Sequence, residues 1–198
     1  MKLRTFTASH AGRILLAAVP VAVASVLVMG GVANGAVPVS FAISGSQFKI
    51  SASELNGTGF SQYAGVANDT AGKPHAVAIA NIDSASLADL CQSVVTQTPL
   101  GKVSMIITAG GGGAPATATG LQIGMTDLKG NTTFDNVRIG VDASTVKTAA
   151  KGAAGDFAQD SDSLKITGLQ QTAWSTQAAV FTLTGMHVAL NSDGKECF

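Results

Sequence analysis

The chain has 198 residues, and its 12 lysine and arginine residues balance 12 aspartate and glutamate residues. Charged residues make up only 12% and hydrophobic residues 46% of the chain, which excludes a disordered polar polypeptide. The absence of a basic excess argues against nucleic acid as a partner, because nucleic-acid binding needs a positive face that displaces counterions.

The amino terminus has the pattern of an export signal. Three basic residues, Lys2, Arg4 and Arg13, precede an apolar run over residues 14–29, and small residues follow it. This order predicts a secretory signal peptide over residues 1–35. Because the apolar run approaches the length that spans a bilayer, an uncleaved membrane anchor is the alternative.

Removal of the signal changes the charge balance. Residues 36–198 keep nine basic and twelve acidic residues, a net charge of −3, in 163 residues. This length suits a single exported domain, located outside the cell or in the cell envelope.

Alternating apolar residues run through most of the exported part. This period of two predicts strands that are buried on one face. Turn-forming residues separate the runs at Asn56-Gly57, residues 110–115, Lys129-Gly130-Asn131 and Asp193-Gly194. The alternating residues are Val39, Phe41 and Ile43; Phe48, Ile50 and Ala52; Val77 and Ile79; Val103, Met105 and Ile107; Leu121, Ile123 and Met125; Val137, Ile139 and Val141.

Two stretches depart from this alternation. Residues 86–95 are predicted to form a short helix, with Leu87, Leu90 and Val94 on one face. Residues 148–160 are rich in alanine, glycine and aspartate and are predicted to form a loop.

A short pattern of two spaced apolar residues, then serine or threonine, then glycine recurs. It ends at Gly45, Gly168 and Gly185, with a weaker copy at Gly120. The apolar phase changes at some of these glycines, which is typical of a β-bulge or a bent strand. Because the spacing between copies is irregular, we expect an all-β, bent antiparallel sandwich. A solenoid-like β fold is the alternative.

The two cysteines, Cys91 and Cys197, both belong to the exported part. An even pair in an oxidising compartment predicts one disulfide. It would hold the carboxyl terminus to the middle of the chain.

Catalytic and metal-binding patterns are weak. The G-x-S-x-G elbow of α/β-hydrolases is absent, and the nearest stretch, around Ser61, has Tyr63 in place of the second glycine. His75 and His187 are the only histidines of the exported part that could act as a base. We therefore expect no catalytic residues, no cofactor and no metal. Asp156, Asp160 and Asp162 lack a calcium-loop pattern and are interpreted as a solvated loop.

Aromatic residues offer a different kind of site. An apolar ligand held between sheets would need a cavity lined by large side chains. The candidates are Phe41, Phe48, Phe134, Trp174 and Phe181.

Several stretches of the exported part resemble an uncharacterised exported family of actinobacteria of the streptomycete type. Its members are often labelled "cholesterol esterase". Both cysteines fall inside the shared stretches, which are Ser40–Gly45, Asn56–Phe60, Leu90–Val95, Thr108–Gly113, Thr172–Thr176 and Glu196–Phe198.

The resemblance implies an extracellular or cell-envelope location, and it brings no established fold or catalytic residues. Since the elbow is missing, the residues do not support the esterase label. The leading hypothesis is a non-enzymatic secreted or envelope protein with a structural or assembly role, whose partners are further copies of itself or envelope components. The alternatives are a module that binds a lipid or sterol and, second, a lipid ester hydrolase.

Overall fold

The computed structural model describes residues 43–99 and 101–198. The predicted signal peptide and Phe41 lie outside the described residues. The described chain is all-β and antiparallel, as predicted, with one 3-10 turn. Its elements are β1 (Phe48–Asn68), β2 (Pro74–Ala88), β3 (Leu90–Thr98), β4 (Gly101–Ala109), β5 (Ala116–Asp135), β6 (Arg138–Asp142), η1 (Ala143–Thr145), β7 (Phe157–Gln177), β8 (Val180–Thr182) and β9 (His187–Asn191).

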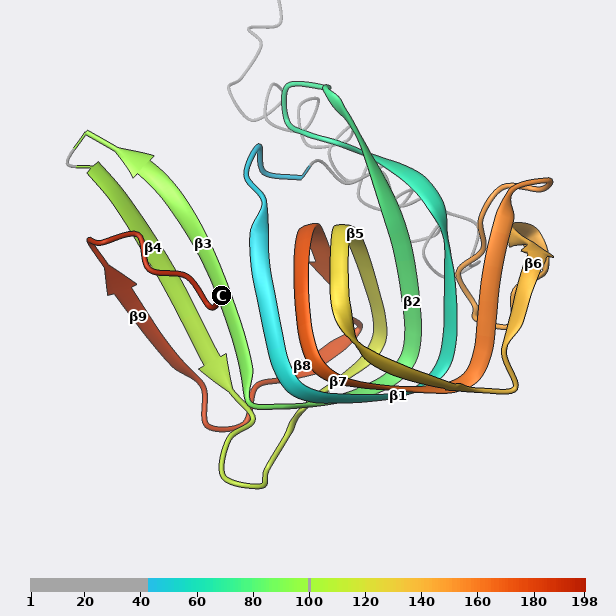
Figure 1. Ribbon diagram of the computed structural model, residues 1–198. Helices are drawn as coiled ribbons and strands as arrows, with labels where there is room; N and C mark the ends of the chain where they lie inside the picture. The colour runs from blue at the N-terminus through green and yellow to red at the C-terminus, as the bar shows by residue number, and fades with distance from the viewer. Residues whose placement is uncertain (1–42, 100) are drawn as a thin grey trace, which may run out of the picture. The chain divides into compact units, whose positions relative to one another are not determined.

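Four long strands form a closed cycle of pairings, which we call the strand ring. β1 pairs with β2, β2 with β5, β5 with β7, and β7 again with β1. These strands have 15 to 21 residues, several times the usual length, so they must bend to share one core. Figure 1 shows β1, β5 and β7 curving through the bend.

The bends coincide with glycines of the recurring pattern. Gly120 and Gly168 lie inside β5 and β7 and have φ of +58° and +65°. The register between β1 and β7 continues past Gly168, from Ala52↔Leu169 to Glu54↔Thr167, while Gly168 itself has no Cα partner. Left-handed backbone without a Cβ thus turns the strand and switches which side chains face the core.

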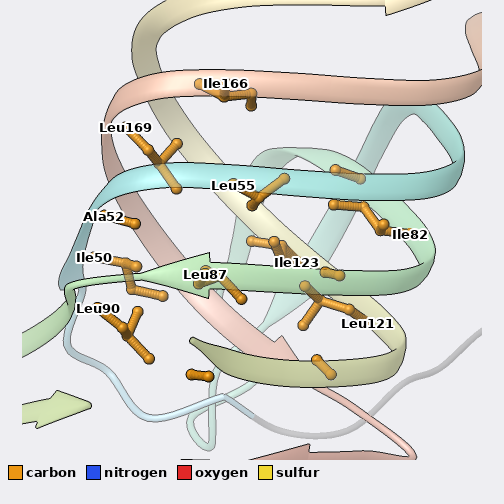
Figure 2. Packing of buried hydrophobic residues seen from close by; sticks show 14 of the residues in the cluster. Ile50, Ala52, Leu55, Ile82, Leu87, Leu90, Leu121, Ile123, Ile166 and Leu169 are labelled. Atoms are coloured by element: carbon orange, nitrogen blue, oxygen red, sulfur yellow. The ribbon is translucent and has the colours of Figure 1, made fainter. Parts of the chain in front are cut away.

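The core of the ring consists mainly of aliphatic side chains from its four strands, together with Leu90 of β3 and Ala109 of β4 (Figure 2). On β7, the buried residues change from odd to even numbers across Gly168: Leu169 and Ala173 on one side, Ile166 and Leu164 on the other. The predicted phase change inside a strand is therefore confirmed at Gly168, whereas Gly185 lies between β8 and β9.

A second unit of the sheet, β3, β4 and β9, continues from the ring, and we call it the wing. β3 pairs with the first residues of β1, β4 with β3, and β9 with β4. β9 ends the strand order on this side and β6 ends it on the other.

Three local predictions are wrong. Residues 86–95 form no helix, because β2 and β3 meet at a tight turn where Asp89 has φ of +50°. Ser53 Oγ donates to Asp89 Oδ2 at 2.6 Å and lies 3.2 Å from the Ala88 carbonyl oxygen, and these contacts fix the reversal. The hairpin brings Leu87 and Leu90 into the core from two strands rather than from one helix face.

The other two errors are turns that lie inside strands. Asn56-Gly57 is in the middle of β1, where a Cβ on Gly57 would lie 2.5 Å from Leu164 Cδ2 and 2.8 Å from Ile82 Cγ2. This glycine serves close packing and not chain reversal. Lys129-Gly130-Asn131 lies in β5 at a register shift, which is a bulge.

The remaining turn predictions agree with the structure. Residues 110–115 connect β4 to β5, and Asp193-Gly194 follows β9. The loop predicted over residues 148–160 ends four residues earlier, since β7 begins at Phe157. Within the described ranges, no helix has the length and hydropathy needed to cross a membrane.

Candidate functional site

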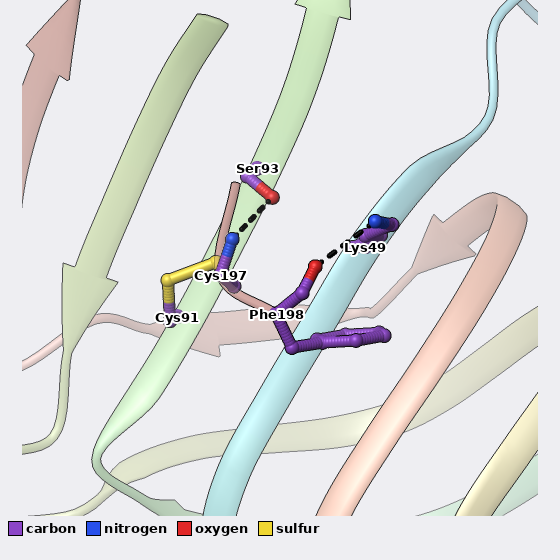
Figure 3. Close-up of a disulfide and its surroundings, with 5 residues drawn as sticks. All are labelled: Lys49, Cys91, Ser93, Cys197 and Phe198. Atoms are coloured by element: carbon purple, nitrogen blue, oxygen red, sulfur yellow. Dashed lines mark hydrogen bonds between the residues drawn. A yellow bond between two sulfur atoms is a disulfide. The ribbon is translucent and has the colours of Figure 1, made fainter. Parts of the chain in front are cut away.

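The predicted disulfide is present and fastens the tail to the wing (Figure 3). Cys91 and Cys197 are 106 residues apart in sequence. The backbone N–H of Cys197 donates to Ser93 Oγ at 3.0 Å. Lys49 Nζ binds both Glu196 Oε2 at 2.8 Å and the Phe198 carbonyl at 2.9 Å. The tail thereby covers one face of the wing.

The opposite face of the wing carries no charge. Opposed residues share a face, and the rows Gln92↔Ile107↔Val188 and Val94↔Met105↔Leu190 cross β3, β4 and β9. We call the five hydrophobic residues of these rows the apolar face. Its outer part is open to solvent in the described structure: Val188 is 47% exposed and Leu190 is 72% exposed.

Three of the five aromatic residues proposed to line a ligand site converge on one groove. Phe48, Trp174 and Phe181, from β1, β7 and β8, line an open groove of about 360 Å³. We call it the aromatic groove. Its other lining residues among those described are Ile43, Ser44, Gln92, Ser175 and Thr176.

Phe134 belongs to a different place. Its ring packs on Phe60 with centroids 5.4 Å apart, beside a core cavity of about 50 Å³. This volume holds a water molecule or two and is far below that of a ligand pocket. Phe41 lies outside the described residues, so the structure says nothing of its place.

A bulge and a stacked histidine position Trp174. Between β5 and β7, Gly124 pairs with Ser175 and Met125 with Ala173, which leaves Trp174 without a partner at the register shift. Such bulges redirect a side chain. The His75 ring stacks on the indole with centroids 3.9 Å apart.

His75 is in turn held by a carboxylate. Its Nε2 lies 3.1 Å from Asp69 Oδ2, and both side chains are nearly buried. The other oxygen of Asp69 accepts the backbone N–H groups of Ala71 and Lys73 at 2.9 Å. The Lys73 N–H, followed by the His75 ring, lowers the pKa of Asp69. The hairpin turn after β1 therefore determines where the indole lies.

The serine of the incomplete elbow pattern is engaged in other contacts. Ser61 is fully buried; its Oγ lies 2.5 Å from Thr148 Oγ1 and accepts from Asn81 Nδ2 at 3.2 Å. His187 is exposed on β9. In the described part of the chain, no serine hydroxyl hydrogen-bonds to His75 or His187.

The aspartates interpreted as a solvated loop belong largely to strand β7. Asp160 is fully buried, and Arg138 Nε and Nη2 donate to its two oxygens at 2.9 and 2.5 Å. Asp162 pairs with Lys147 at 2.5 Å. Between residues 43 and 198, position 100 excepted, no cluster of three metal-ligating side chains occurs.

Sequence reasoning named Phe48, Trp174 and Phe181 because they are large and aromatic. It missed Gln92, Ser175 and Thr176, which supply polar groups to the same groove. It also missed the link from Asp69 through His75 to Trp174. His75 and Trp174 are 99 residues apart, and no local pattern joins them.

Residues 44–198 match a family described as "family of unknown function (DUF6230)", and the chain belongs to this family. The match covers the strand ring, the wing and both cysteines. Neither the curated proteins nor the solved structures contain a match to the chain.

Proposed function

We propose that this protein is a non-enzymatic structural protein, exported to the cell surface, that assembles with further copies of itself. The single observation that carries the proposal is the free edge of β9 beside the apolar face. The disulfide supports an oxidising location outside the cytoplasm.

The two sheet edges differ in a way that favours pairing at β9. Natural proteins protect an edge strand with charges, prolines or bulges. β6 has Arg138, Asp142 and a bulge between Ile139 and Val141. β9 has the sequence HVALN, without lysine, acid or proline, and in the described structure it pairs only with β4.

Two copies of β9 can pair around a two-fold axis. An antiparallel arrangement centred on Ala189 places Val188 of one copy opposite Leu190 of the other, on the apolar face, and joins two wings into one sheet. Such self-complementary contact is the commonest geometry of homodimers. The low net charge adds little repulsion between copies.

The test is the oligomeric state of the secreted protein, measured by light scattering after size exclusion and by sedimentation velocity. We expect a concentration-dependent dimer for the wild type and a monomer for Leu190→Lys, because the lysine would face apolar Val188 of the other copy. Val66→Lys is the matched control: Val66 is 62% exposed on β1, and this variant should remain dimeric.

A cross-link tests the register. Ala189→Cys should give a disulfide-linked dimer under non-reducing conditions, because directly opposed residues have Cβ atoms about 5 Å apart. A wild-type protein that stays monomeric at all attainable concentrations contradicts the proposal, as does equal behaviour of the two lysine variants.

A further inference from the structure

The aromatic groove is a site for which the assembly proposal gives no role. We propose that it binds a neutral sugar, one or two pyranose rings of a surface glycan. This inference is independent of β9 pairing.

The lining chemistry suits an uncharged ligand with one apolar and one hydroxylated side. Phe48, Trp174 and Phe181 supply aromatic surface, and Phe181 is 37% exposed. Ser44, Gln92 and Ser175 supply hydroxyl and amide groups, and none of the described lining residues is charged. A pyranose ring has a face of C–H groups that packs on an aromatic plane, and its hydroxyls need amide and hydroxyl partners at the rim.

One polar atom of the groove lacks a partner. Thr176 Oγ1 is buried, and the described residues give it no hydrogen bond. A buried hydroxyl without a partner costs free energy that a bound hydroxyl would recover. Thr176 lines the same groove as Trp174, two residues further along β7.

The indole is held in place before any ligand arrives. The stack of His75 on Trp174 and the contact of His75 with Asp69 hold the ring at the groove. A platform that is already ordered loses little conformational entropy when a ligand binds.

The shape of the groove disfavours a sterol or acyl chain. Sites for such ligands enclose most of the ligand surface among apolar side chains. The aromatic groove is open and half of its described lining residues are polar, while the core cavity beside Phe134 has only about 50 Å³. A sugar retains its solvent contact on one side and fits an open groove.

Trp174 is the single tryptophan of the chain, so intrinsic fluorescence reports on the groove directly. The secreted protein would be titrated with cellobiose, maltose and N,N′-diacetylchitobiose, and separately with oleate and a proline-rich peptide. We expect a saturable shift of the emission with at least one disaccharide and none with oleate or the peptide.

Variants locate the site by calorimetry, with folding checked by circular dichroism. Trp174→Ala should weaken disaccharide binding at least about tenfold, and Gln92→Ala and Thr176→Val should each weaken it several-fold. Phe157→Ala removes an aromatic residue that is 65% exposed on β7 outside the groove, and binding should be unchanged.

Folded protein that binds none of the disaccharides overturns the proposal. Saturable binding of oleate or of the peptide in their place also overturns it and assigns the groove to that class. Leu190→Lys should bind the disaccharide like the wild type, so failure of assembly and failure of sugar binding are separate results.

Discussion

At the scale of single residues, the most unusual group is the buried carboxylate of Asp160. The guanidinium of Arg138 is the main reason that its pKa is lowered, and the backbone N–H of Lys147 adds a hydrogen bond at 2.8 Å. Asp160 is paired with Ser61 across β1 and β7, and a row of polar side chains continues through Asn81 to Gln122. In this row, side-chain hydrogen bonds join Ser61 to Asn81 and Asn81 to Gln122, across β1, β2 and β5.

We predict that Asp160 contributes acid-sensitive stability. Because its folded pKa is lowered, its contribution is fully present above the unfolded value of about 4 and is lost as pH falls through the folded pKa. Asp160→Asn should lower the free energy of unfolding at neutral pH by about 1–3 kcal/mol and flatten its decline in acid. Urea unfolding at a series of pH values measures both.

The matched variant is Asp127→Asn. Asp127 is half-exposed and its carboxylate lies 3.5 Å from Lys129 Nζ, so loss of its charge should change stability by less than about 0.5 kcal/mol. An Asp160→Asn protein with the wild-type slope in acid would show that the Arg138 pair adds nothing to folding.

At the scale of elements, the bent strands depend on glycine. A Cβ on Gly168 would meet no atom within 4 Å, so a substitution there tests backbone conformation alone. Gly45 ends another copy of the same sequence pattern and also has open space, but its φ is outside the left-handed region.

We predict that Gly168→Ala costs about 1–2 kcal/mol, the penalty for an L-residue in left-handed backbone. Gly168→Asn should cost less, since asparagine tolerates this region. Gly45→Ala should be neutral or slightly stabilising because it restricts only the unfolded chain. Thermal unfolding of the three variants measures these differences in stability. Equal effects of alanine at positions 45 and 168 would contradict the prediction that the left-handed backbone at Gly168 requires glycine.

The same elements show what the sequence can and cannot predict. Period-two alternation identified stretches of β1, β2, β4, β5 and β6, and it follows burial most closely in the ring, where one face of each strand is buried. The sequence predicts turns at Gly57 and Gly130, but a tight turn, a bulge and close packing all favour glycine. The residue type therefore does not distinguish these three roles. The prediction of a helix over residues 86–95 is wrong because Leu87 and Leu90 belong to two strands of a hairpin. The reversal at Asp89 places both in the core, so their three-residue spacing does not reflect a helix.

The site was predictable only in part for a related reason. Residue type singled out Phe48, Trp174 and Phe181, but their meeting depends on the long-range pairings of β1 with β7 and of β8 with β5. Phe134 has the same chemistry and packs instead on Phe60. Residue type therefore identifies aromatic residues that could line a site, and the strand pairing determines which of them meet.

At the scale of the molecule, the ring and the wing should differ in stability. Each ring strand pairs on both sides over much of its length, whereas strand pairing between the wing and the ring is confined, among the described residues, to β1 Phe48–Ser51 with β3. The wing holds its own tail by the disulfide and the Ser93 hydrogen bond. Regions with few buried contacts open first in native hydrogen exchange.

We therefore predict an order of hydrogen exchange, measured by mass spectrometry on the purified protein. Amides of β1 and β7 should exchange last, and those of β9 first. In the double variant Cys91→Ser/Cys197→Ser, exchange should accelerate in residues 192–198, β9 and β4, while the ring remains protected relative to them.

The loss of stability expected for the double variant follows from the length of the loop that the disulfide closes. Closing a loop of about 100 residues in the unfolded chain is worth about 4–5 kcal/mol, so the double variant should also lose several kcal/mol of global stability in urea. Ser93→Ala, which removes one tail hydrogen bond and leaves the disulfide, should show only the local acceleration at residues 196–198. If exchange in the double variant rises equally in the ring and in the wing at low denaturant, the prediction is wrong. The ring and the wing would then open as one unit, and the disulfide would stabilise the whole fold.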